Sequence, residues 1–267
     1  MFLYTPTPIE TYALGQRVVY VKRDDLFAVP PAPPLAKMRG LSHLLSHLLC
    51  DGVSLVGAFE AGASSVGHAV AAATAPLHGL RCLIGYVSTE CRPISESARK
   101  AQYLGAELLP LRPNVMNVCY AQTKRVVEER GGYMIPFGFE FPEAVQGVAD
   151  EASTVPPELS ASGTVIVCCG SGITLAGLCK GLQGRPARFV GVSCGRTSAK
   201  IRACLDRQDI GKNQPIELVE PWMPYREPCF VDCPFPSDAF YDKKAWAYLI
   251  SNIESMQDPL LYWNVGA

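Results

Sequence analysis

The fold is decided by residues 165–178, which read Val-Ile-Val-Cys-Cys-Gly-Ser-Gly-Ile-Thr-Leu-Ala-Gly-Leu. The apolar, β-branched run at the start predicts a strand that is covered on both faces. Gly170 and Gly172 then permit a tight turn whose backbone N–H groups point to one place, and a helix begins beyond them. Because a helix N-terminus attracts anions, this turn is a natural seat for a phosphate group. The candidate phosphate ligands are Gly170, Ser171, Gly172, Ile173 and Thr174.

Two larger phosphate ligands do not fit the spacing of this turn. A dinucleotide fingerprint requires a third glycine where Leu175 stands, and a Walker loop requires a Lys-Ser or Lys-Thr pair, whereas the next lysine is Lys180. A strand–turn–helix connection that binds nothing remains the alternative at this point. If a phosphate binds here, it belongs to a smaller cofactor.

Length and charge exclude several classes of protein. The 267 residues suffice for one large domain or two lobes. With 25 acidic and 24 basic residues the net charge is −1, so we expect neither strong binding to a nucleic-acid backbone nor a polybasic membrane patch. No apolar run reaches the roughly 18 residues of a membrane span, and the N-terminus does not resemble a signal peptide. The chain is therefore expected to be cytoplasmic.

Metal binding and disulfides are not expected. The odd count of 11 cysteines, many of them in apolar runs, is typical of buried reduced thiols. His43 and His47 lie one helical turn apart, but no glutamate or third ligand accompanies them, so a surface pair is favoured. Cys229 and Cys233 lack the further ligands that structural zinc requires.

The order of the predicted elements indicates an α/β protein. A strand is predicted within residues 16–26, and strands and helices then alternate from residue 53 to residue 206, which favours parallel sheets with helices on both faces. Residues 211–238 are rich in proline and cysteine and are predicted to be irregular, and a last helix is expected over residues 243–255.

Lys37 is a candidate for covalent chemistry because it follows an apolar, proline-rich loop at residues 28–36. A lysine in a dry site loses its proton and can form a Schiff base. Taken alone, Lys37 is more readily explained as a solvated surface residue. The phosphate turn changes that balance, because pyridoxal 5'-phosphate needs both a lysine for its aldehyde and a seat for its phosphate.

Two further segments fit the same cofactor. Residues 62–69 follow a predicted strand and begin a helix, so their backbone N–H groups are suited to bind a carboxylate. Ser65 could supply a hydroxyl to the substrate. The alternative for Ser65 is a helix N-cap, which serine favours. Asp242 is either an N-cap or the partner of the pyridine nitrogen, where a carboxylate would keep the nitrogen protonated.

With these segments in place, the chain resembles the fold-type II, tryptophan synthase β-like family of pyridoxal-phosphate-dependent enzymes. Within it, the chain is most similar to the group of 1-aminocyclopropane-1-carboxylate deaminase and D-cysteine desulfhydrase. The resemblance covers most of the chain in the family's order and is carried by residues 5–10, Val21-Lys22-Arg23-Asp24-Asp25-Leu26, Lys37-Met38-Arg39, residues 170–177 and residues 238–245.

The resemblance implies a two-lobed α/β structure of the tryptophan synthase β-like fold. A smaller lobe, residues 40–135, would be inserted in a larger cofactor-binding lobe made of residues 1–39 and 136–267, with the cofactor in the cleft between them. Lys37 would be the Schiff-base lysine, Tyr241 an active-site phenol and Asp242 the group beside the pyridine nitrogen. A homodimer is also implied.

The chain departs from the family pattern at two sites. The Gly-Asn that precedes the lysine is replaced by Leu35-Ala36, and the Gln-Ser-Asn-His loop aligns with Ser64-Ser65-Val66-Gly67, which lacks the asparagine. The chain is also short for the group. A short and divergent chain of this kind resembles compact bacteriophage members of the family, which process glycyl-modified thymine during DNA hypermodification. For such a protein the location would be the host cytoplasm.

Three functions remain open on these grounds. In the first, the protein is a deaminase or lyase that breaks a bond at the α-carbon of a small amino acid after the substrate amine has replaced Lys37 in the imine. In the second, it is an α-decarboxylase or lyase that acts on an amino-acid group carried on a nucleotide, such as a glycyl-modified thymidine. In the third, it is a non-catalytic carrier of pyridoxal 5'-phosphate. Lys37, Ser65 and Tyr241 are the catalytic candidates.

Overall fold

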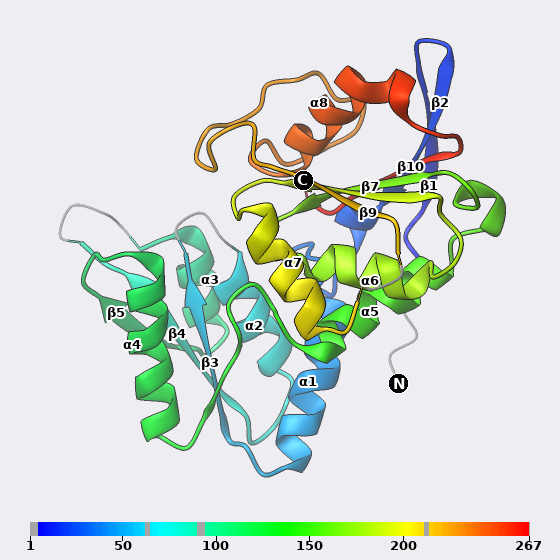
Figure 1. The fold of residues 1–267 in the computed structure, drawn as a ribbon. Helices are drawn as coiled ribbons and strands as arrows, with labels where there is room; N and C mark the ends of the chain where they lie inside the picture. Colours follow the sequence, from blue (N-terminus) through cyan, green and yellow to red (C-terminus); the bar gives the residue numbers. More distant parts are fainter. Residues whose placement is uncertain (1–4, 62–64, 90–93, 211–213, 267) are drawn as a thin grey trace. The chain divides into compact units, whose positions relative to one another are not determined.

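The computed structural model describes residues 5–61, 65–89, 94–210 and 214–266. The chain divides into two compact units, which are coloured along the sequence in Figure 1. The larger unit comprises Met1–Phe27, Pro34–Lys37 and Glu140–Ala267, and the smaller unit comprises Ala28–Pro33 and Met38–Phe139.

The larger unit is built on a six-stranded sheet in the order β1-β2-β10-β7-β8-β9. β1 and β2 form an antiparallel hairpin, and every other neighbouring pair in the sheet is parallel. The strands are β1 (Ile9–Leu14), β2 (Arg17–Arg23), β7 (Thr164–Cys169), β8 (Arg188–Ser193), β9 (Ile216–Val219) and β10 (Leu260–Asn264).

Helices cover both faces of this sheet. Figure 1 shows α8 on one face and α5 and α6 on the other. Every residue of β7 and β10 is buried, as expected for central strands covered on both faces. The helical elements are η1 (Asp24–Leu26), α5 (Pro142–Ser153), η2 (Pro157–Leu159), α6 (Ile173–Gly181), α7 (Ser198–Arg207), α8 (Asp242–Asn252) and η3 (Ile253–Ser255).

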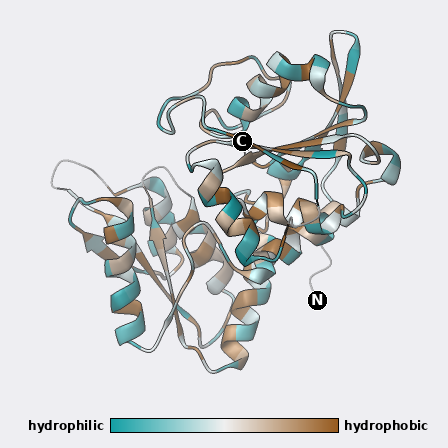
Figure 2. Cartoon of the chain, in the orientation of Figure 1, coloured by the Kyte–Doolittle hydropathy of each residue, from teal (hydrophilic) through white to brown (hydrophobic). Residues whose placement is uncertain are grey.

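The smaller unit has a four-stranded parallel sheet in the order β5-β4-β3-β6. Its elements are α1 (Met38–Cys50), β3 (Leu55–Glu60), α2 (Val66–Thr74), β4 (Arg81–Val87), α3 (Glu96–Tyr103), β5 (Glu107–Leu111), α4 (Met116–Glu129) and β6 (Tyr133–Met134). Figure 2 shows hydrophobic residues along the strands of both sheets and hydrophilic residues on the outer side of α4. The described part of the chain contains no helix long and apolar enough to cross a bilayer.

Glycines let α4 approach the smaller sheet closely. A Cβ added at Gly57 would lie 2.2 Å from Val127 of α4, and one at Gly85 would lie 2.0 Å from Thr123. Side chains alternate between the two faces of a strand, so Ile84, next to Gly85, points to the opposite face, where it lies against Gly67 of α2. The two helices therefore cover opposite faces of this sheet.

Three strands differ from the sequence-based expectation. Residues 211–238 were predicted to be irregular, but β9 forms an edge strand within them and pairs with β8. The hairpin partner β1 and the C-terminal strand β10 were not predicted. β10 is only five residues long and β9 four, and pairing with strands distant in the sequence, rather than local pattern, stabilises them.

Candidate active site

The predicted phosphate turn lies at the carboxyl end of β7, where the chain leaves the central strands of the larger sheet. Gly172 has φ +99° and forms the N-cap of α6, a left-handed conformation that favours glycine. The first backbone hydrogen bond of this helix runs from the Ala176 N–H to the Gly172 carbonyl, 2.9 Å. The N–H groups between them precede the helical ladder, and N–H groups in this position at a helix N-terminus favour an anion.

The topology of the larger sheet marks the same place. From β7 the chain steps to β8 and then β9 on one side, whereas β10 lies on the other side of β7. Ligands of open α/β sheets bind at the carboxyl ends of the strands where the strand order reverses in this way. Ser171 and Thr174, whose hydroxyls are candidate ligands, are buried in this turn.

Lys37 immediately precedes α1 and belongs to the larger unit. Its side chain keeps partial access to solvent, but the surrounding protein lowers the pKa of the ammonium by desolvation, and the positive charge of Arg196 acts in the same direction. Cys168, Cys204 and Glu140 oppose this shift. A lysine with a lowered pKa is more often neutral near pH 7, which is the form that attacks an aldehyde.

Glu140, whose charge acts on Lys37, pairs with two arginines. Its carboxylate forms ion pairs with Arg196 and, at 2.7 Å, with Arg207. Arg196 follows β8, and its carbonyl accepts a hydrogen bond from the Ser193 hydroxyl. Glu140 raises the pKa of Lys37 and so acts against Arg196, whereas desolvation is the main cause of the lowered pKa.

Asp242 is the first residue of α8 and is 0 % exposed. Its Oδ1 accepts hydrogen bonds from the Val265 N–H at 2.9 Å and from the Cys168 thiol at 3.3 Å, whereas Oδ2 has no partner among the described residues. Burial raises the pKa of this carboxyl to about 8, and the two hydrogen bonds act against that shift. A buried carboxylate with one vacant oxygen is suited to a cationic N–H partner.

Tyr241 connects this carboxyl with the phosphate turn. A Cβ added at Gly170 would lie 3.3 Å from Cε1 of Tyr241, so the ring lies directly against the turn. The phenol oxygens of Tyr241 and Tyr225 are 2.8 Å apart. Burial raises the pKa of Tyr241, which keeps the phenol protonated and able to donate at neutral pH.

These residues fit pyridoxal 5'-phosphate. The turn at residues 170–174 is suited to the phosphate, the partly accessible Lys37 to the aldehyde, and the vacant Oδ2 of Asp242 to the protonated ring nitrogen. All three belong to the larger unit. Cys168, which follows the apolar run of β7, binds Asp242 and shifts the pKa of Lys37, so it lies between the two ends of the site.

Ser65 belongs to the smaller unit and stands at the N-cap position of α2. Its side chain makes no capping hydrogen bond, so the N-cap alternative does not account for the hydroxyl. The preceding part of the predicted substrate loop, residues 62–64, lies outside the described residues. The next helical N–H groups were expected to hold a ligand carboxylate, but the Gly67 N–H donates to the chain's own Glu60 at 3.0 Å.

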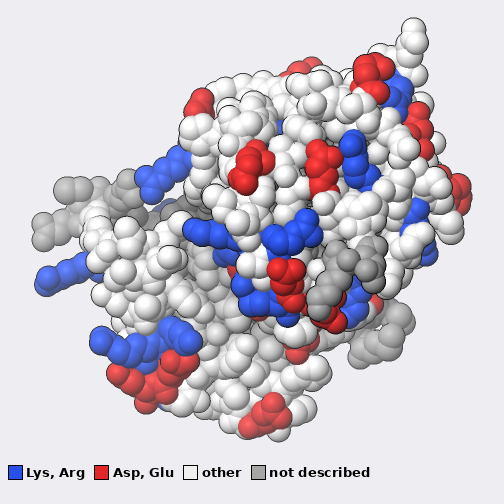
Figure 3. All heavy atoms as spheres, in the orientation of Figure 1, with Lys and Arg blue, Asp and Glu red and all other residues white. Residues whose placement is uncertain are grey.

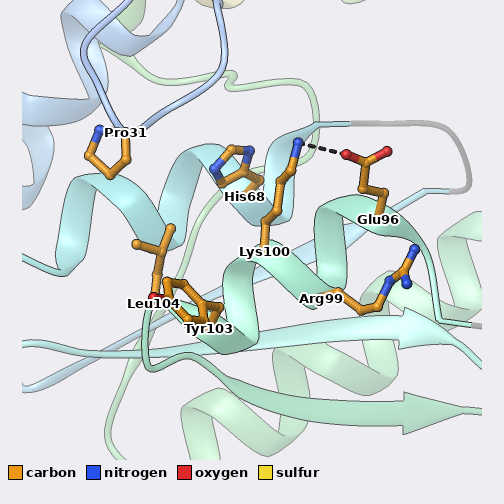
Figure 4. A pocket seen from close by; sticks show the side chains of 7 residues that line it. All are labelled: Pro31, His68, Glu96, Arg99, Lys100, Tyr103 and Leu104. Atoms are coloured by element: carbon orange, nitrogen blue, oxygen red, sulfur yellow. Dashed lines mark ion pairs between the residues drawn. The ribbon is translucent and has the colours of Figure 1, made fainter.

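The smaller unit also has a surface hollow of about 670 Å³. Figure 4 shows that residues of α2 and α3 line it and that Lys100 and Glu96, 2.7 Å apart, form an ion pair at its edge. The hollow contains none of the predicted site residues, and Tyr103 on its rim is 92 % exposed. The lining residues are Pro31, His68, Glu96, Arg99, Lys100, Tyr103 and Leu104.

Four polar residues with notable contacts were not anticipated from the sequence: Glu60 in the smaller unit, and Glu140, Cys168 and Arg196 in the larger unit. Glu60 ends an apolar strand, and a charged residue at the carboxyl end of a buried parallel strand is a signal that was available. Glu140 and Arg196 are 56 residues apart and pair only in the folded chain.

Comparison with known proteins identifies the family of this chain. A family model described as "Pyridoxal-phosphate dependent enzyme" matches residues 1–224. The glycyl-dTMP PLP-dependent decarboxylase of Pseudomonas phage M6 is 27 % identical over 276 residues, which cover 97 % of this chain and 98 % of that protein.

Solved structures show the same fold. An ACC deaminase homologue superposes with a TM-score of 0.81 at 21 % identity, covering 99 % of this chain and 90 % of that one. The processed form of threonine deaminase isoform 2 from Solanum lycopersicum gives 0.70 at 15 % identity, covering 98 % and 83 %. Because the family model spans most of its length, the chain belongs to the pyridoxal-phosphate-dependent enzyme family and uses pyridoxal 5'-phosphate as its cofactor.

Proposed function

We propose that this enzyme is an α-decarboxylase that acts on an amino-acid group carried on a nucleotide, with a glycyl-bearing thymidine nucleotide as its substrate class. The similarity to the phage glycyl-dTMP decarboxylase, which extends over nearly the full length of both chains, carries this proposal. The similarity to the ACC deaminase homologue is at 21 % identity and concerns the fold alone.

We propose the following division of labour for the cofactor. The N–H groups and hydroxyls of Gly170, Ser171, Gly172, Ile173 and Thr174 hold the phosphate. Lys37 would bind the aldehyde carbon, and Asp242 Oδ2 would accept a hydrogen bond from the protonated ring nitrogen, which would supply the partner that this buried oxygen lacks. When bound, pyridoxal 5'-phosphate accepts the electron pair left on the substrate's α-carbon.

The remaining roles are those of protein groups near the substrate. Lys37 Nζ, with its lowered pKa, is the group that delivers a proton to the α-carbon after carbon dioxide has left. Tyr241, protonated and in contact with the turn, positions the substrate or relays a proton. Ser65 contributes a hydroxyl to the substrate from the start of α2, since it is not used as a helix cap.

The charge distribution supports recognition of a nucleotide through a pocket. On the face shown in Figure 3 basic and acidic side chains are interspersed, and the net charge of the chain is −1. Binding to duplex DNA through its backbone requires several unpaired basic groups along one surface. We therefore expect the base and its glycyl group to dominate recognition, with weak dependence on salt.

A deaminase acting on a small amino acid is the second candidate. It is favoured by the segments Val21–Leu26 and 238–245, which resemble the deaminase group, and by the phenol of Tyr241 beside the phosphate turn. The resemblance also implies a homodimer in the cytoplasm, and light scattering on the purified protein measures its oligomeric state.

One experiment separates these reactions. The purified protein is loaded with pyridoxal 5'-phosphate and incubated with glycyl-dTMP or with a panel of small amino acids. Carbon dioxide release from glycyl-dTMP with retention of the amine supports the decarboxylase. Ammonia and a keto acid from a small amino acid, with no carbon dioxide from glycyl-dTMP, would instead establish the deaminase.

A further inference from the structure

The thiol of Cys168 lies beside the buried carboxyl group of Asp242. Cys168 belongs to β7, and its side chain is buried in a core cluster that also contains Cys194 and Tyr262. Its Sγ atom lies 3.3 Å from Oδ1 of Asp242, and both residues belong to the larger unit. The roles proposed above include none for this thiol, although it contacts the carboxyl group that would meet the cofactor.

The single proton of this thiol is directed to the carboxyl group. The neighbouring Cys194 thiol, burial and the charge of Asp242 raise the pKa of Cys168 well above its ordinary value, so the thiol keeps its proton at neutral pH. Cys194 is a competing acceptor, but a carboxyl oxygen accepts a hydrogen bond more strongly than sulfur does. Cys194 has an acceptor of its own, the Tyr241 carbonyl at 3.3 Å. Cys168 is therefore a donor to Oδ1.

The two oxygens of Asp242 have different surroundings. Oδ1 accepts hydrogen bonds from the Val265 N–H at 2.9 Å and from the Cys168 thiol, whereas Oδ2 has no partner among the described residues. A Cβ added at Gly266 would lie 3.3 Å from Oδ2, so a side chain at that residue would crowd this oxygen. The Tyr262 hydroxyl donates to the Asp242 carbonyl at 2.6 Å. The backbone and one oxygen of Asp242 are thus held, and the other oxygen is left for a ligand.

We propose that Cys168 is a positioning residue for the cofactor: its thiol, together with the Val265 N–H, holds Oδ1 of Asp242 so that Oδ2 is the oxygen that meets the ring nitrogen. This inference rests on the role proposed above for Asp242. Rotation about the Cβ–Cγ bond of an aspartate has no narrow preference. Hydrogen bonds therefore decide which oxygen is held and which is free.

The thiol also favours the charged form of the carboxyl group. In the cofactor-free protein burial raises the pKa of Asp242 to about 8, so the group is mostly neutral at pH 7. A hydrogen bond to an ionised acceptor is roughly twice as strong as one to a neutral acceptor. A carboxylate paired with a protonated ring nitrogen therefore gains more from the Cys168 thiol than the neutral carboxyl group does. The thiol thus strengthens binding of a ring that carries this nitrogen.

The adjacent Cys169 provides a matched comparison, because it points to the other face of the sheet. A Cβ added at Gly191 of β8 would lie 3.0 Å from Sγ of Cys169 and 2.7 Å from Leu175 of α6. Cys168 instead contacts Asp242 of α8, and Figure 1 shows α6 and α8 on opposite faces. Both thiols are buried, so replacing either one removes the same group from the core. The change at Cys168 also removes the donor to Asp242.

The first test compares two ligands that differ only in the ring nitrogen: pyridoxal 5'-phosphate and its deaza analogue, in which a C–H group replaces that nitrogen. Equilibrium titration measures the affinity of the protein for each. The natural protein should bind pyridoxal 5'-phosphate more tightly than the analogue. In Cys168→Ala we expect the ratio of the two affinities to fall about fivefold, because the donor to Oδ1 is lost. Cys168→Ser should restore most of the ratio, since its hydroxyl is also a donor.

Cys169→Ala is the control and should keep the natural ratio. A folded Cys168→Ala protein with the natural ratio, or a Cys168→Ser protein that behaves like Cys168→Ala, would overturn the inference. Equal affinities of the natural protein for the two ligands would refute both the role of Asp242 and the inference that rests on it. Absence of carbon dioxide release from glycyl-dTMP would refute the proposed reaction, whereas the affinity ratios still decide the role of Cys168.

A second measurement uses the cofactor-free protein. The infrared difference between the natural protein and Cys168→Ser isolates the S–H stretching band of Cys168, and the same difference is recorded with Asp242→Ala present in both proteins. We expect the band to lie at lower frequency when Asp242 is present, because a hydrogen bond to the carboxyl oxygen weakens the S–H bond. The same frequency with and without Asp242 would show that the thiol proton does not point to this residue, and the inference would be wrong.

Discussion

Lys37 is the residue whose chemistry depends most on its surroundings, because desolvation lowers the pKa of its ammonium and so favours the neutral, nucleophilic amine. We expect Lys37→Ala to abolish the imine absorbance band of the holoenzyme and to slow turnover by about a thousandfold or more, since both covalent attachment and proton delivery are removed. Lys180→Ala, at an exposed lysine of α6, is the control and should leave the band intact. Retention of the band in Lys37→Ala would contradict the assignment.

The raised pKa of Asp242 leads to a prediction about how the free energy of unfolding depends on pH. Its folded-state pKa of about 8 lies well above the value of about 3.9 for an unfolded aspartate, so the folded protein binds the extra proton between these values. This group's stabilisation is complete below pH 4 and is lost as the pH rises toward 8. The cofactor-free protein should therefore lose about 1.4 kcal/mol of unfolding free energy per pH unit through this group.

Asp242→Asn should remove that part of the slope, which urea unfolding of the cofactor-free protein at several pH values from 5 to 8 measures. Asp51→Asn, at an exposed carboxylate of the smaller unit, should leave the slope unchanged. Equal slopes for the natural protein and Asp242→Asn would show that the buried carboxyl does not retain its proton in the folded state.

At the scale of elements, the junction of β7 and α6 depends on the backbone conformation of Gly172. At φ +99° an alanine is strained, and its Cβ would lie 3.2 Å from Ile201 Cγ2. We expect Gly172→Ala to weaken cofactor binding at least tenfold, because the strain is relieved by moving the N–H groups that hold the phosphate. Equilibrium titration with pyridoxal 5'-phosphate measures this.

Gly184→Ala is the matched control for that substitution. Gly184 has φ +75° but nothing within 4 Å of an added Cβ, and it lies beyond the far end of α6. It should lower stability by about 1 kcal/mol through backbone strain and leave cofactor affinity unchanged. If both variants bind the cofactor equally well, the turn does not hold the phosphate.

At the scale of the whole molecule, the two units differ in how the chain builds them. The smaller sheet is formed within residues 38–139, whereas the larger sheet places β10, from the C-terminal end of the chain, between β2 and β7. We therefore expect a fragment of residues 38–139 to fold by itself, with cooperative thermal unfolding and dispersed NMR resonances, and not to bind the cofactor, because it lacks Lys37, the turn and Asp242.

A fragment of residues 140–267 should not fold, because β10 would lose its partner β2. Circular dichroism and NMR of the two fragments compare them directly. An unfolded 38–139 fragment, or a cooperatively folded 140–267 fragment, would show that stability is distributed differently between the units.

Strands β7 and β10 of the larger sheet show where the local sequence pattern predicts a strand and where it does not. β7 is apolar from Val165 to Cys169 and β-branched at Val165, Ile166 and Val167, so its character is visible in the sequence. Leu260–Asn264 is as deeply buried, but its five residues include Tyr262, Trp263 and Asn264 and show no strand alternation. Parallel pairing with β2 and β7, some 240 and 96 residues earlier, makes it a strand.

The sequence by itself determined the class of fold, the strand–turn–helix at residues 165–178 and the cofactor, because these depend on short-range features: an apolar strand, glycines at a turn, and motifs in the family's order around Lys37 and Asp242. Only the tertiary structure decided which groups surround them. It left Oδ2 of Asp242 without a partner, placed Cys168 beside it, and seated Glu60 on the N-terminus of α2. Burial and hydrogen bonds between residues distant in the sequence decide which ionisable groups are charged and which polar atoms lack a partner. No local stretch of sequence encodes either property.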